Sequence, residues 1–593
     1  MAKVRLGPLQ WIASLIVGES FAQASQGVGN VKILVFEIDD VGKPLPLNNP
    51  QILAQTVTDL DGNFSVTLPA GKDLASNLIV QASSAGIPAP IGALNVLNCP
   101  AVKATLQINP ASEAGTRQLI GTPLSNFTKR EVEVFLGFLQ HEAQEIIKAK
   151  LEDTVQEINT QLQAEMQAYL NEMKTLGQGG TSLVGGTYQL VRFLANTKSN
   201  SVQRSVESDT LTFDAASGTV TGQIRNEVNK LDIPNSPACS RNYTFSSVVE
   251  SRNVSGSYLR AGNGRLAIPL SNGETLVGYV NAAGTVAIFP FKDVASGLLG
   301  FGVAIKKGSG ISVATVQGTY NDEEIKGYLN PSGNFFGTWP GAASALIGTG
   351  TIQFNGSNYS VNGTESWMRQ MVSCNVAQSP PITAIFTALV DQGLFTAPLS
   401  LTSDGTITLT DPTPGLAPKV GTVSSDGTYM LLPSTQVDSQ KTGYIIATRA
   451  ATGLTATSLQ GTYHVISLGD VMTSTGTISK NLVIGTAVFD PLTNTQAFNG
   501  AGISINRTEE LCSGSSCASI SLSTITVAEN QSYAVTPDGV LQLTSASLGQ
   551  LNGWVSPDAS VTVLMNASDN VPLALGSPVN VSRRSIAVAV KAP

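Results

Sequence analysis

The sequence predicts a mainly β, multidomain protein: an N-terminal β-sandwich, one long helix, and then three tandem antiparallel β-barrel or β-sandwich repeats. Three observations lead to this fold class. The chain has 593 residues, whereas single hydrophobic cores seldom grow past about 250–300 residues. Only 13% of the residues are charged, which is typical of short strands joined by tight turns. A unit of about 135 residues recurs three times in the C-terminal two thirds.

The first 24 residues have the order of a secretory signal peptide. Lys3 and Arg5 precede an apolar stretch over residues 6–17, and Ala22-Gln23-Ala24 supplies a small-x-small cleavage pattern. No later run approaches the ~20 apolar residues that a membrane-spanning helix needs. We therefore expect a secreted or cell-surface protein with no membrane span.

Residues 28–100 alternate between apolar and polar positions, with Gly, Asp and Pro between the runs. This pattern predicts a small β-sandwich. The segment T-D-L-D-G-N-F-S-V-T-L-P-A-G at 58–71 follows a G-K-P-L turn at 42–45. The two together resemble the carboxypeptidase-regulatory-like (transthyretin-like) modules of secreted bacterial proteins. That resemblance implies a non-catalytic spacer or binding platform.

A different pattern over residues 127–176 predicts one long helix. Thr128 and Glu131 form a capping box at its start, and Phe127 can pack on Val132. Apolar residues then recur in steps of three and four, close to the period of a coiled coil. Two interpretations stand open: self-association of chains through this seam, or packing of the helix along the β-domains of its own chain. The seam residues are Leu151, Val155, Ile158, Leu162, Met166, Tyr169 and Met173.

The threefold repeat covers residues 183–310, 314–452 and 457–593, and two aligned motifs define it. In the first and third copies both motifs are 275 positions apart, Gly186 from Gly461 and Gly278 from Gly553. Such agreement indicates a repeated structural unit. The first motif, G-T-Y, stands at 186–188, 318–320 and 461–463, and the second, a paired-strand block, at 277–289, 420–432 and 552–564.

Each copy contains eight or nine short strands separated by turn signals such as Asp404-Gly405 and Asp538-Gly539, which predicts an antiparallel meander. Each copy also ends on an apolar strand. If this last strand pairs with the G-T-Y strand, the meander closes into a small barrel without exposed edges. A two-sheet sandwich is the alternative. The strand order loosely resembles calycin-type barrels, including transferrin-binding-protein-like surface barrels of bacteria.

Charge and cysteine content exclude several classes of function. The net charge is −8, with no Lys/Arg cluster after residue 25, so we expect no nucleic-acid partner. The sequence has no CxxC and no Cys/His ligand spacing, so we expect no metal or cofactor. Cys512 and Cys517 are close enough in sequence to close a small disulfide loop, and the pairing of Cys99, Cys239 and Cys374 stays open.

Candidate catalytic residues are few. His141 is expected on a solvated helix and His464 on a strand, pointing to solvent, and neither has evident partners. The densest acidic group is Asp322, Glu323 and Glu324, with Glu365 in the same copy. Paired carboxylates can hydrolyse glycosides, but a solvated loop is the simpler interpretation. We therefore expect no enzyme activity.

Binding is the better supported class, because an antiparallel barrel can leave room for one small ligand. The aromatic residues of the repeated block could contact a glycan or a small apolar ligand, or they could form core. The leading hypothesis is a non-enzymatic exported protein whose tandem modules serve adhesion, assembly or ligand binding. A carbohydrate-active or carbohydrate-binding protein and a subunit of an extracellular fibre are the alternatives. The aromatic candidates are Tyr279, Phe289, Tyr429 and Trp554.

Overall fold

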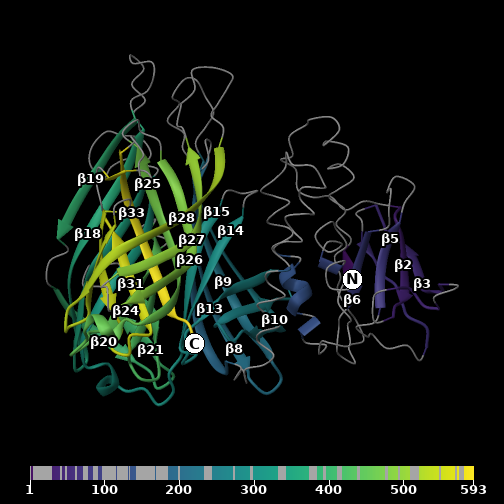
Figure 1. The fold of residues 1–593 in the computed structure, drawn as a ribbon, viewed down its shortest axis with the longest axis horizontal. Helices are drawn as coiled ribbons and strands as arrows, with labels where there is room; N and C mark the ends of the chain where they lie inside the picture. Colours follow the sequence, from purple (N-terminus) through teal and green to yellow (C-terminus); the bar gives the residue numbers. More distant parts are fainter. Residues whose placement is uncertain are drawn as a thin grey trace.

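The structure is a computed structural model, and the strands that it describes form five sheets. Figure 1 shows the three largest gathered at one end of the molecule and a small sheet at the other. The structure describes residues 2–3, 30–39, 43–46, 50–60, 63–70, 78–83, 91–95, 115–116, 131–132, 134–139, 141, 167, 184–197, 201–232, 244–271, 274–293, 298–330, 342–372, 383–391, 395–410, 417–436, 441–473, 478–491, 495–507, 520–545, 549–567, 571–572 and 580–593.

The N-terminal region forms one four-stranded antiparallel sheet in the order β3-β2-β5-β6. Its core is a small apolar cluster that includes Ile33, Val35 and Val80. The described residues do not show the second large sheet that a sandwich requires, so the sandwich stays a prediction. The strands are β2 (Lys32–Glu37), β3 (Ile52–Val57), β5 (Leu78–Ser83) and β6 (Ile91–Asn95), with a separate pair of β1 (Ala2–Lys3) and β4 (Asn63–Phe64).

Barrel 1, residues 186–306, is a ring of antiparallel strands in chain order. Its first strand pairs with its last, Phe193 opposite Phe301, and a bridge between Gly256 and Leu270 joins the remaining two edges. The strands are β7 (Gly186–Thr197), β8 (Ser201–Asp214), β9 (Thr219–Asp232), β10 (Thr244–Ser257), β11 (Leu259–Arg260), β12 (Arg265–Pro269), β13 (Thr275–Val280), β14 (Val286–Asp293) and β15 (Leu298–Lys306).

Barrel 2, residues 318–449, closes in the same way, with Ile325 of its first strand opposite Tyr444 of its last. A short 3-10 helix, η2 (Val313–Val316), precedes it. The strands are β16 (Gly318–Asn330), β17 (Ala342–Asn355), β18 (Asn358–Val372), β19 (Thr383–Asp391), β20 (Phe395–Leu401), β21 (Thr406–Leu409), β22 (Lys419–Val423), β23 (Tyr429–Gln436) and β24 (Lys441–Arg449).

Barrel 3, residues 461–591, follows a second 3-10 helix, η4 (Ala456–Ser458). Its first and last strands also pair, with Ile466 opposite Val588. The strands are β25 (Gly461–Thr473), β26 (Ile478–Asp490), β27 (Thr495–Arg507), β28 (Ile520–Val535), β29 (Val540–Ser545), β30 (Gly549–Val555), β31 (Val561–Asn566), β32 (Val571–Pro572) and β33 (Asn580–Lys591).

The pairing of first and last strands confirms the predicted closure and selects the barrel over the sandwich. The G-T-Y glycine shows why this motif opens each copy. Gly186, Gly318 and Gly461 have φ values of 106°, 115° and 104°, a region that residues with a Cβ rarely adopt. Glycine is therefore required where the chain enters each barrel.

Each barrel contains an apolar cluster in its interior, and a fourth apolar cluster joins the three barrels. Successive side chains of a strand point to opposite faces, so Tyr188 and Leu190 fill barrel 1 while Val191 and Phe193 point outward into the shared core. The last strand of every barrel is thus buried on both faces, which explains its apolar run. The shared core takes residues from all three barrels, among them Phe301, Ile325, Tyr444, Ile466, Val563 and Val588.

The described part of the predicted helix packs against barrel 1. Residues 131–132, 134–139 and 141 are helical. Phe138 lies under the guanidinium of Arg265, whose Cζ is 4.9 Å from the ring centroid, and the carbonyl of Gly137 accepts a hydrogen bond from Thr275. This contact favours packing on the protein's own β-domains for the first turns. The seam at 151–173 lies outside the described residues, so the long helix and self-association through it stay predictions.

Candidate functional site

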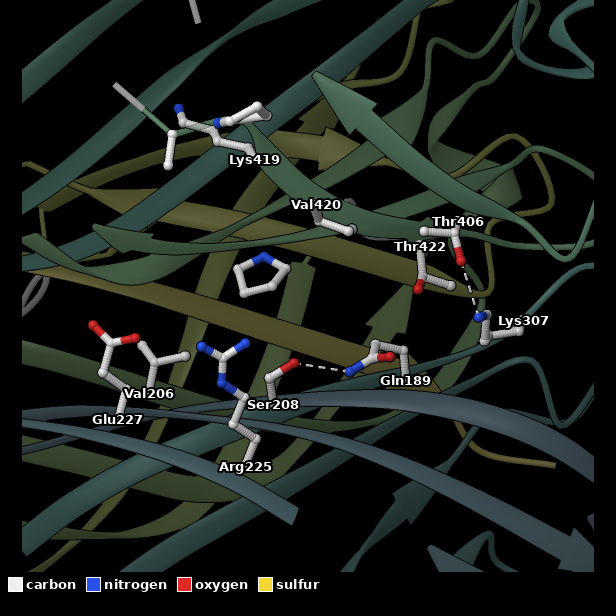
Figure 2. Close-up of a pocket in the computed structure, with 14 residues that line it drawn as sticks. Gln189, Val206, Ser208, Arg225, Glu227, Lys307, Thr406, Lys419, Val420 and Thr422 are labelled. Atoms are coloured by element: carbon white, nitrogen blue, oxygen red, sulfur yellow. Dashed lines mark hydrogen bonds between the residues drawn. The ribbon is translucent and has the colours of Figure 1, made fainter. Parts of the chain in front are cut away.

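A polar cleft separates the outer walls of barrels 1 and 2. Figure 2 shows Gln189, Ser208, Arg225 and Glu227 on strands of barrel 1 facing Val420 and Thr422 on barrel 2. The cleft has a volume of about 370 Å³, within the usual range of small-molecule sites. Its lining residues are Gln189, Val206, Ser208, Arg225, Glu227, Lys307, Thr406, Ala417, Pro418, Lys419, Val420, Gly421, Thr422 and Pro433.

Strand alternation places these side chains on the outside of barrel 1. On β9, Ile224 fills the barrel interior, so Arg225 and Glu227 point outward. Across the ladder Ser208 lies opposite Arg225, and Val206 lies opposite Glu227. The barrel 1 wall of the cleft is therefore made of outward-pointing polar residues of β8 and β9, which lie beside outward-pointing apolar residues of the shared core such as Val206.

Glu227 is the least satisfied group in the cleft. Glu227 is 2% exposed, and its Oε1 has no hydrogen-bond partner among the described residues. Burial raises the pKa of Glu227, and the neighbouring charge of Arg225 opposes that rise. A buried carboxylate oxygen without a donor costs free energy, so a ligand that donates a hydrogen bond here gains affinity.

Fixed hydrogen bonds hold one end of the cleft. The Nζ of Lys307 lies 3.0 Å from Oδ2 of Asp404 and 3.2 Å from Oγ1 of Thr406. The amide of Gln189 donates to Oγ of Ser208 at 2.9 Å (Figure 2). The hydrogen bonds from Thr402 and Lys307 hold the pKa of Asp404 below its usual range. Lys307 is therefore engaged with barrel 2, and it ties the two walls together.

The lining of the cleft consists of hydroxyl, amide, cationic and small apolar groups with one carboxylate. Among its lining residues Glu227 is the one carboxylate, whereas glycoside hydrolysis needs two. The lining contains no His, Cys or Tyr, and its hydroxyl groups belong to Ser208, Thr406 and Thr422. Its cations and hydroxyls can instead hold a polar or anionic ligand.

The acidic group of the second copy is not a solvated loop, as the simpler interpretation held. Asp322, Glu323 and Glu324 lie on β16, and all three are buried. Tyr320 fills the interior of barrel 2, so alternation places Asp322 and Glu324 inside that barrel and Glu323 outside it. Burial raises the pKa of Asp322 to about 7 and that of Glu323 well above its usual value. The side chain of Glu365 lies outside the described residues.

Barrel 1 contains a buried charge cluster that the sequence did not reveal. Arg192 is 1% exposed and forms ion pairs with Glu207, Asp209 and Glu274. Burial raises the pKa of both Glu207 and Asp209, and the charge of Arg192 opposes the rise. Strand alternation was the one sequence signal for this cluster. It places Arg192 of β7 and Glu207 and Asp209 of β8 on the same face as the apolar residues of the barrel interior.

The four candidate aromatic residues lie away from the cleft. Phe289 is buried inside barrel 1, and Tyr429 is buried in the shared core. The ring of Tyr279 stacks on His464 with centroids 3.9 Å apart, while Trp554 lies against Glu323. Tyr279, Tyr429 and Trp554 thus lie between barrels, and a role of the four residues in ligand contact stays a prediction.

His464 does not point to solvent as expected. It is 6% exposed, because the outer face of β25 meets barrel 1. Its Nε2 lies 2.7 Å from the carbonyl oxygen of Asn263, and its ring stacks on Tyr279. His464 therefore joins barrel 3 to barrel 1. His141 is half-buried.

Other predictions cannot be placed. The cysteines Cys99, Cys239, Cys374, Cys512 and Cys517 all lie outside the described residues. Within the described ranges, no group of three His, Cys, Asp or Glu side chains is arranged to hold a metal ion. In the same ranges, no helix is long and apolar enough to cross a membrane.

Comparison with known proteins yields structural similarity alone. No protein-family model and no curated protein matches the sequence, so the resemblance of residues 28–100 to carboxypeptidase-regulatory-like modules stays a prediction. A mutant of the vaccine antigen transferrin binding protein B from Haemophilus parasuis Hp5 has 11% identity, 69% coverage of this chain, 76% coverage of its own and a TM-score of 0.16.

Two further solved structures are similarly distant. Transferrin binding protein B from serogroup B Neisseria meningitidis has 8% identity, covering 65% of this chain and 66% of its own, with a TM-score of 0.18. OprB from Pseudomonas putida has 5% identity, covering 68% of this chain and 91% of its own, with a TM-score of 0.14. Scores this low do not indicate a common overall arrangement, so the function must be argued from the residues of this chain.

Proposed function

We propose that this chain is an exported, non-enzymatic ligand-binding protein, in which three fused barrels form one rigid body and the ligand occupies the cleft between barrels 1 and 2. The observation that carries the proposal is that a cleft large enough for a ligand also contains a buried carboxylate oxygen without a hydrogen-bond partner among the described residues. A void of about 10 Å³ lies among the apolar side chains inside barrel 1, and it is too small for a ligand. The cleft combines about 370 Å³ with the unpartnered Oε1 of Glu227.

Rigidity supports binding at this place. Hydrogen bonds and apolar contacts join the barrels, so the two walls of the cleft are held in register before a ligand arrives. Preorganisation of this kind reduces the entropy lost on binding. Export rests on the signal-peptide pattern at residues 1–24. Display on the cell surface and adhesion are narrower versions of the same proposal, and a subunit of an extracellular fibre is an alternative to it.

The test uses the secreted protein and a variant with a blocked cleft. Val420 is 51% exposed on the wall of the cleft, so Val420→Trp adds bulk there without disturbing a core. A ligand panel read by thermal shift, together with a glycan array, should give ligands that bind the wild type and not Val420→Trp. Ligands that bind both proteins equally would contradict the proposal.

A hydrolase panel on the same protein separates the carbohydrate-active alternative. Glu324 lies inside barrel 2, away from the cleft. Glycosidase activity that disappears in Glu324→Gln or Glu365→Gln would overturn the non-enzymatic function. Absence of turnover in the wild type, with binding that depends on the cleft, is the expected result.

A further inference from the structure

The fourth strand of barrel 1, β10, has one free edge. On one side β10 pairs with β9 along its whole length. On the other side its pairing is confined to its C-terminal end, where Gly256 bridges Leu270 and Ser255 exchanges hydrogen bonds with Ser271. No described strand pairs with this side of residues 244–254. An unpaired strand edge of this kind is a template for pairing with another strand.

Both faces of this edge are exposed, and the strand lacks the features that prevent pairing. Val248 and Val249 are 49% and 46% exposed, although successive side chains of a strand point to opposite faces. Proteins protect long edge strands with proline, lysine or a β-bulge. Residues 244–254 contain no Pro or Lys, and their register with β9 is uninterrupted. The edge is thus open to an extended partner.

The hydrogen bonds of Ser255 show which residues of β10 point toward the free edge. The backbone N–H and C=O of Ser255 both bond to Ser271, on the side away from β9. Backbone groups alternate sides along an antiparallel strand, so Val249, Ser251 and Asn253 also direct their N–H and C=O groups away from β9. A partner strand must therefore place residues that bond in the same direction opposite these three.

A free carboxylate and a partly free guanidinium lie on this edge. Glu250 is exposed and forms no ion pair with the described residues. Arg252 is 49% exposed and contacts Glu274 through Nη2 alone, at 3.5 Å, while Arg192 engages the other oxygen of Glu274. The remaining guanidinium nitrogens of Arg252 can therefore bind a second carboxylate.

These two charges select one register for self-pairing. When two copies of β10 run antiparallel about a twofold axis through Ser251, Glu250 of each copy lies opposite Arg252 of the other. Opposite charges directly across a ladder stabilise it. An axis through Val249 leaves Glu250 opposite Val248, without an ion pair, and an axis nearer the C-terminus meets the part of the edge that is already bonded. The charges therefore favour pairing about Ser251.

The equivalent strands of the other barrels do not offer this complementarity. β19 and residues 520–531 of β28 also have one side without a described partner strand. Each carries one acidic residue and no basic residue, Asp391 in β19 and Glu529 in β28. Self-pairing of either strand would gain no ion pair, so β10 is the edge best suited to a second copy.

We propose that β10 pairs with β10 of a second copy of this chain, antiparallel and about a twofold axis through Ser251. Residues 248–254 of the two copies form the ladder, with about six backbone hydrogen bonds and two ion pairs between Glu250 and Arg252. The strand presents the same surface to its copy, as a twofold dimer requires. This inference goes beyond the proposed function, since ligand binding in the cleft does not require a dimer.

The first test is sedimentation equilibrium of the full secreted chain. An edge ladder is a small interface, so we expect a monomer–dimer equilibrium with a Kd of about 10 µM. Glu250→Arg places like charges opposite each other twice and should weaken the dimer by about tenfold or more. Glu250→Arg combined with Arg252→Glu restores opposite charges and should return the affinity to that of the wild type. Circular dichroism and the melting temperature show whether each variant is folded.

Cysteine pairing provides a second test that leaves both charges in place. Residues that exchange both hydrogen bonds across an antiparallel pair have Cα atoms about 5.5 Å apart, within the range of a disulfide. Ser251→Cys should therefore form a disulfide-linked dimer under mild oxidation, above the level in the wild type. Ser246→Cys, at another exposed position of β10, puts the two cysteines about 34 Å apart and should not.

The outcomes decide the proposal directly. A monomer at every concentration up to about 100 µM, or a dimer that Glu250→Arg leaves unchanged, would overturn it. Equal cross-linking of Ser251→Cys and Ser246→Cys would overturn the register. Val420→Trp blocks the cleft and leaves β10 intact, so it should dimerise like the wild type; loss of the dimer in this variant would place the interface at the cleft instead.

Discussion

The hydroxyl of Tyr188 donates a hydrogen bond to the backbone carbonyl of Gly284, 96 positions along the chain. Tyr320 bonds to Gly427 and Tyr463 to Ala559 in the same way. The tyrosine belongs to the G-T-Y motif, and its acceptor lies in the turn of the second repeated block. The two sequence motifs that define the repeat are therefore hydrogen-bond partners across each barrel.

Loss of this bond should destabilise the protein. Tyr188→Phe keeps the ring in place and leaves the buried carbonyl of Gly284 without its donor. We expect the free energy of unfolding to fall by about 1–2 kcal/mol, measured by urea denaturation. A loss of less than about 0.5 kcal/mol would contradict this, because it would mean that water can replace the hydroxyl as the donor to the carbonyl of Gly284.

Tyr444→Phe is the matched control. The hydroxyl of Tyr444 is buried in the shared core without a hydrogen-bond partner among the described residues. Removing an unpaired buried polar group relieves a desolvation cost. We expect Tyr444→Phe to be neutral or stabilising in the same denaturation experiment, and destabilisation similar to that of Tyr188→Phe would show that the hydroxyl is paired.

Ala559 occupies a turn position at which the other two copies have glycine. Its φ is 52°, against 66° for Gly284 and 68° for Gly427. A Cβ in this left-handed region costs about 1–2 kcal/mol, part of which the greater freedom of unfolded glycine offsets. Ala559→Gly should raise the free energy of unfolding by about 0.5–1 kcal/mol, and Gly284→Ala should lower it. Equal signs for the two changes would contradict the assignment.

The three barrels meet at Ser560. Its Oγ lies 3.0 Å from the hydroxyl of Tyr429 in barrel 2 and 3.1 Å from Nδ2 of Asn281 in barrel 1. A double-mutant cycle of Ser560→Ala with Asn281→Ala should give a coupling energy of about 0.5–1 kcal/mol. Thr428→Ala, at the equivalent turn position of barrel 2, should show no coupling to Asn281→Ala, because Thr428 bonds within its own turn to Asp426.

Stability should fall as the pH rises through the neutral range, partly because of Asp322. Burial raises its folded pKa to about 7, Glu324 adds to the rise, and Lys419 and Lys326 oppose it. Between about pH 4 and pH 7 the folded state then binds more protons than the unfolded state, so this contribution to stability is lost as the pH rises. Asp322→Asn should flatten that loss, measured as the urea midpoint at pH 4.5 and pH 7.5.

Asp404 provides the opposite sign. Its pKa is lowered, first by the hydrogen bond from Thr402 and then by Lys307, so its contribution is present at neutral pH and disappears as the pH falls below about 4. Asp404→Asn should therefore lower stability slightly at pH 7.5 and not in acid. An identical pH profile for both aspartate variants would contradict both assignments.

The architecture of the barrels follows closely from the sequence, since it depends on local signals. Turn residues separate the strands, and the apolar runs at 301–306, 444–448 and 586–591 identify the closing strands. The predicted pairing of first and last strands is present in all three copies. The helix seam and the cysteines fall on residues that the structure does not describe, so these predictions stand untested.

The candidate site could not be predicted, because it lies between barrels. Arg225 and Glu227 are on β9, and Lys419 is on β22, nearly 200 positions later in the chain. Nothing local marks these residues as neighbours. The same reason explains the wrong prediction for His464. Its strand pattern places it on the outer face of β25, but the pattern does not show that barrel 1 packs on that face.

The sequence by itself determined the number of repeats and the antiparallel meander within each, because turns and alternation act over short distances, and it left the closed barrel and the sandwich as alternatives. The tertiary structure alone decided what the outer faces contact. Apolar outer residues from three barrels unite in one core, and the polar residues beside them are left to line a cleft. Alternation tells which side chains leave a barrel, but the packing of whole barrels sets which of them meet.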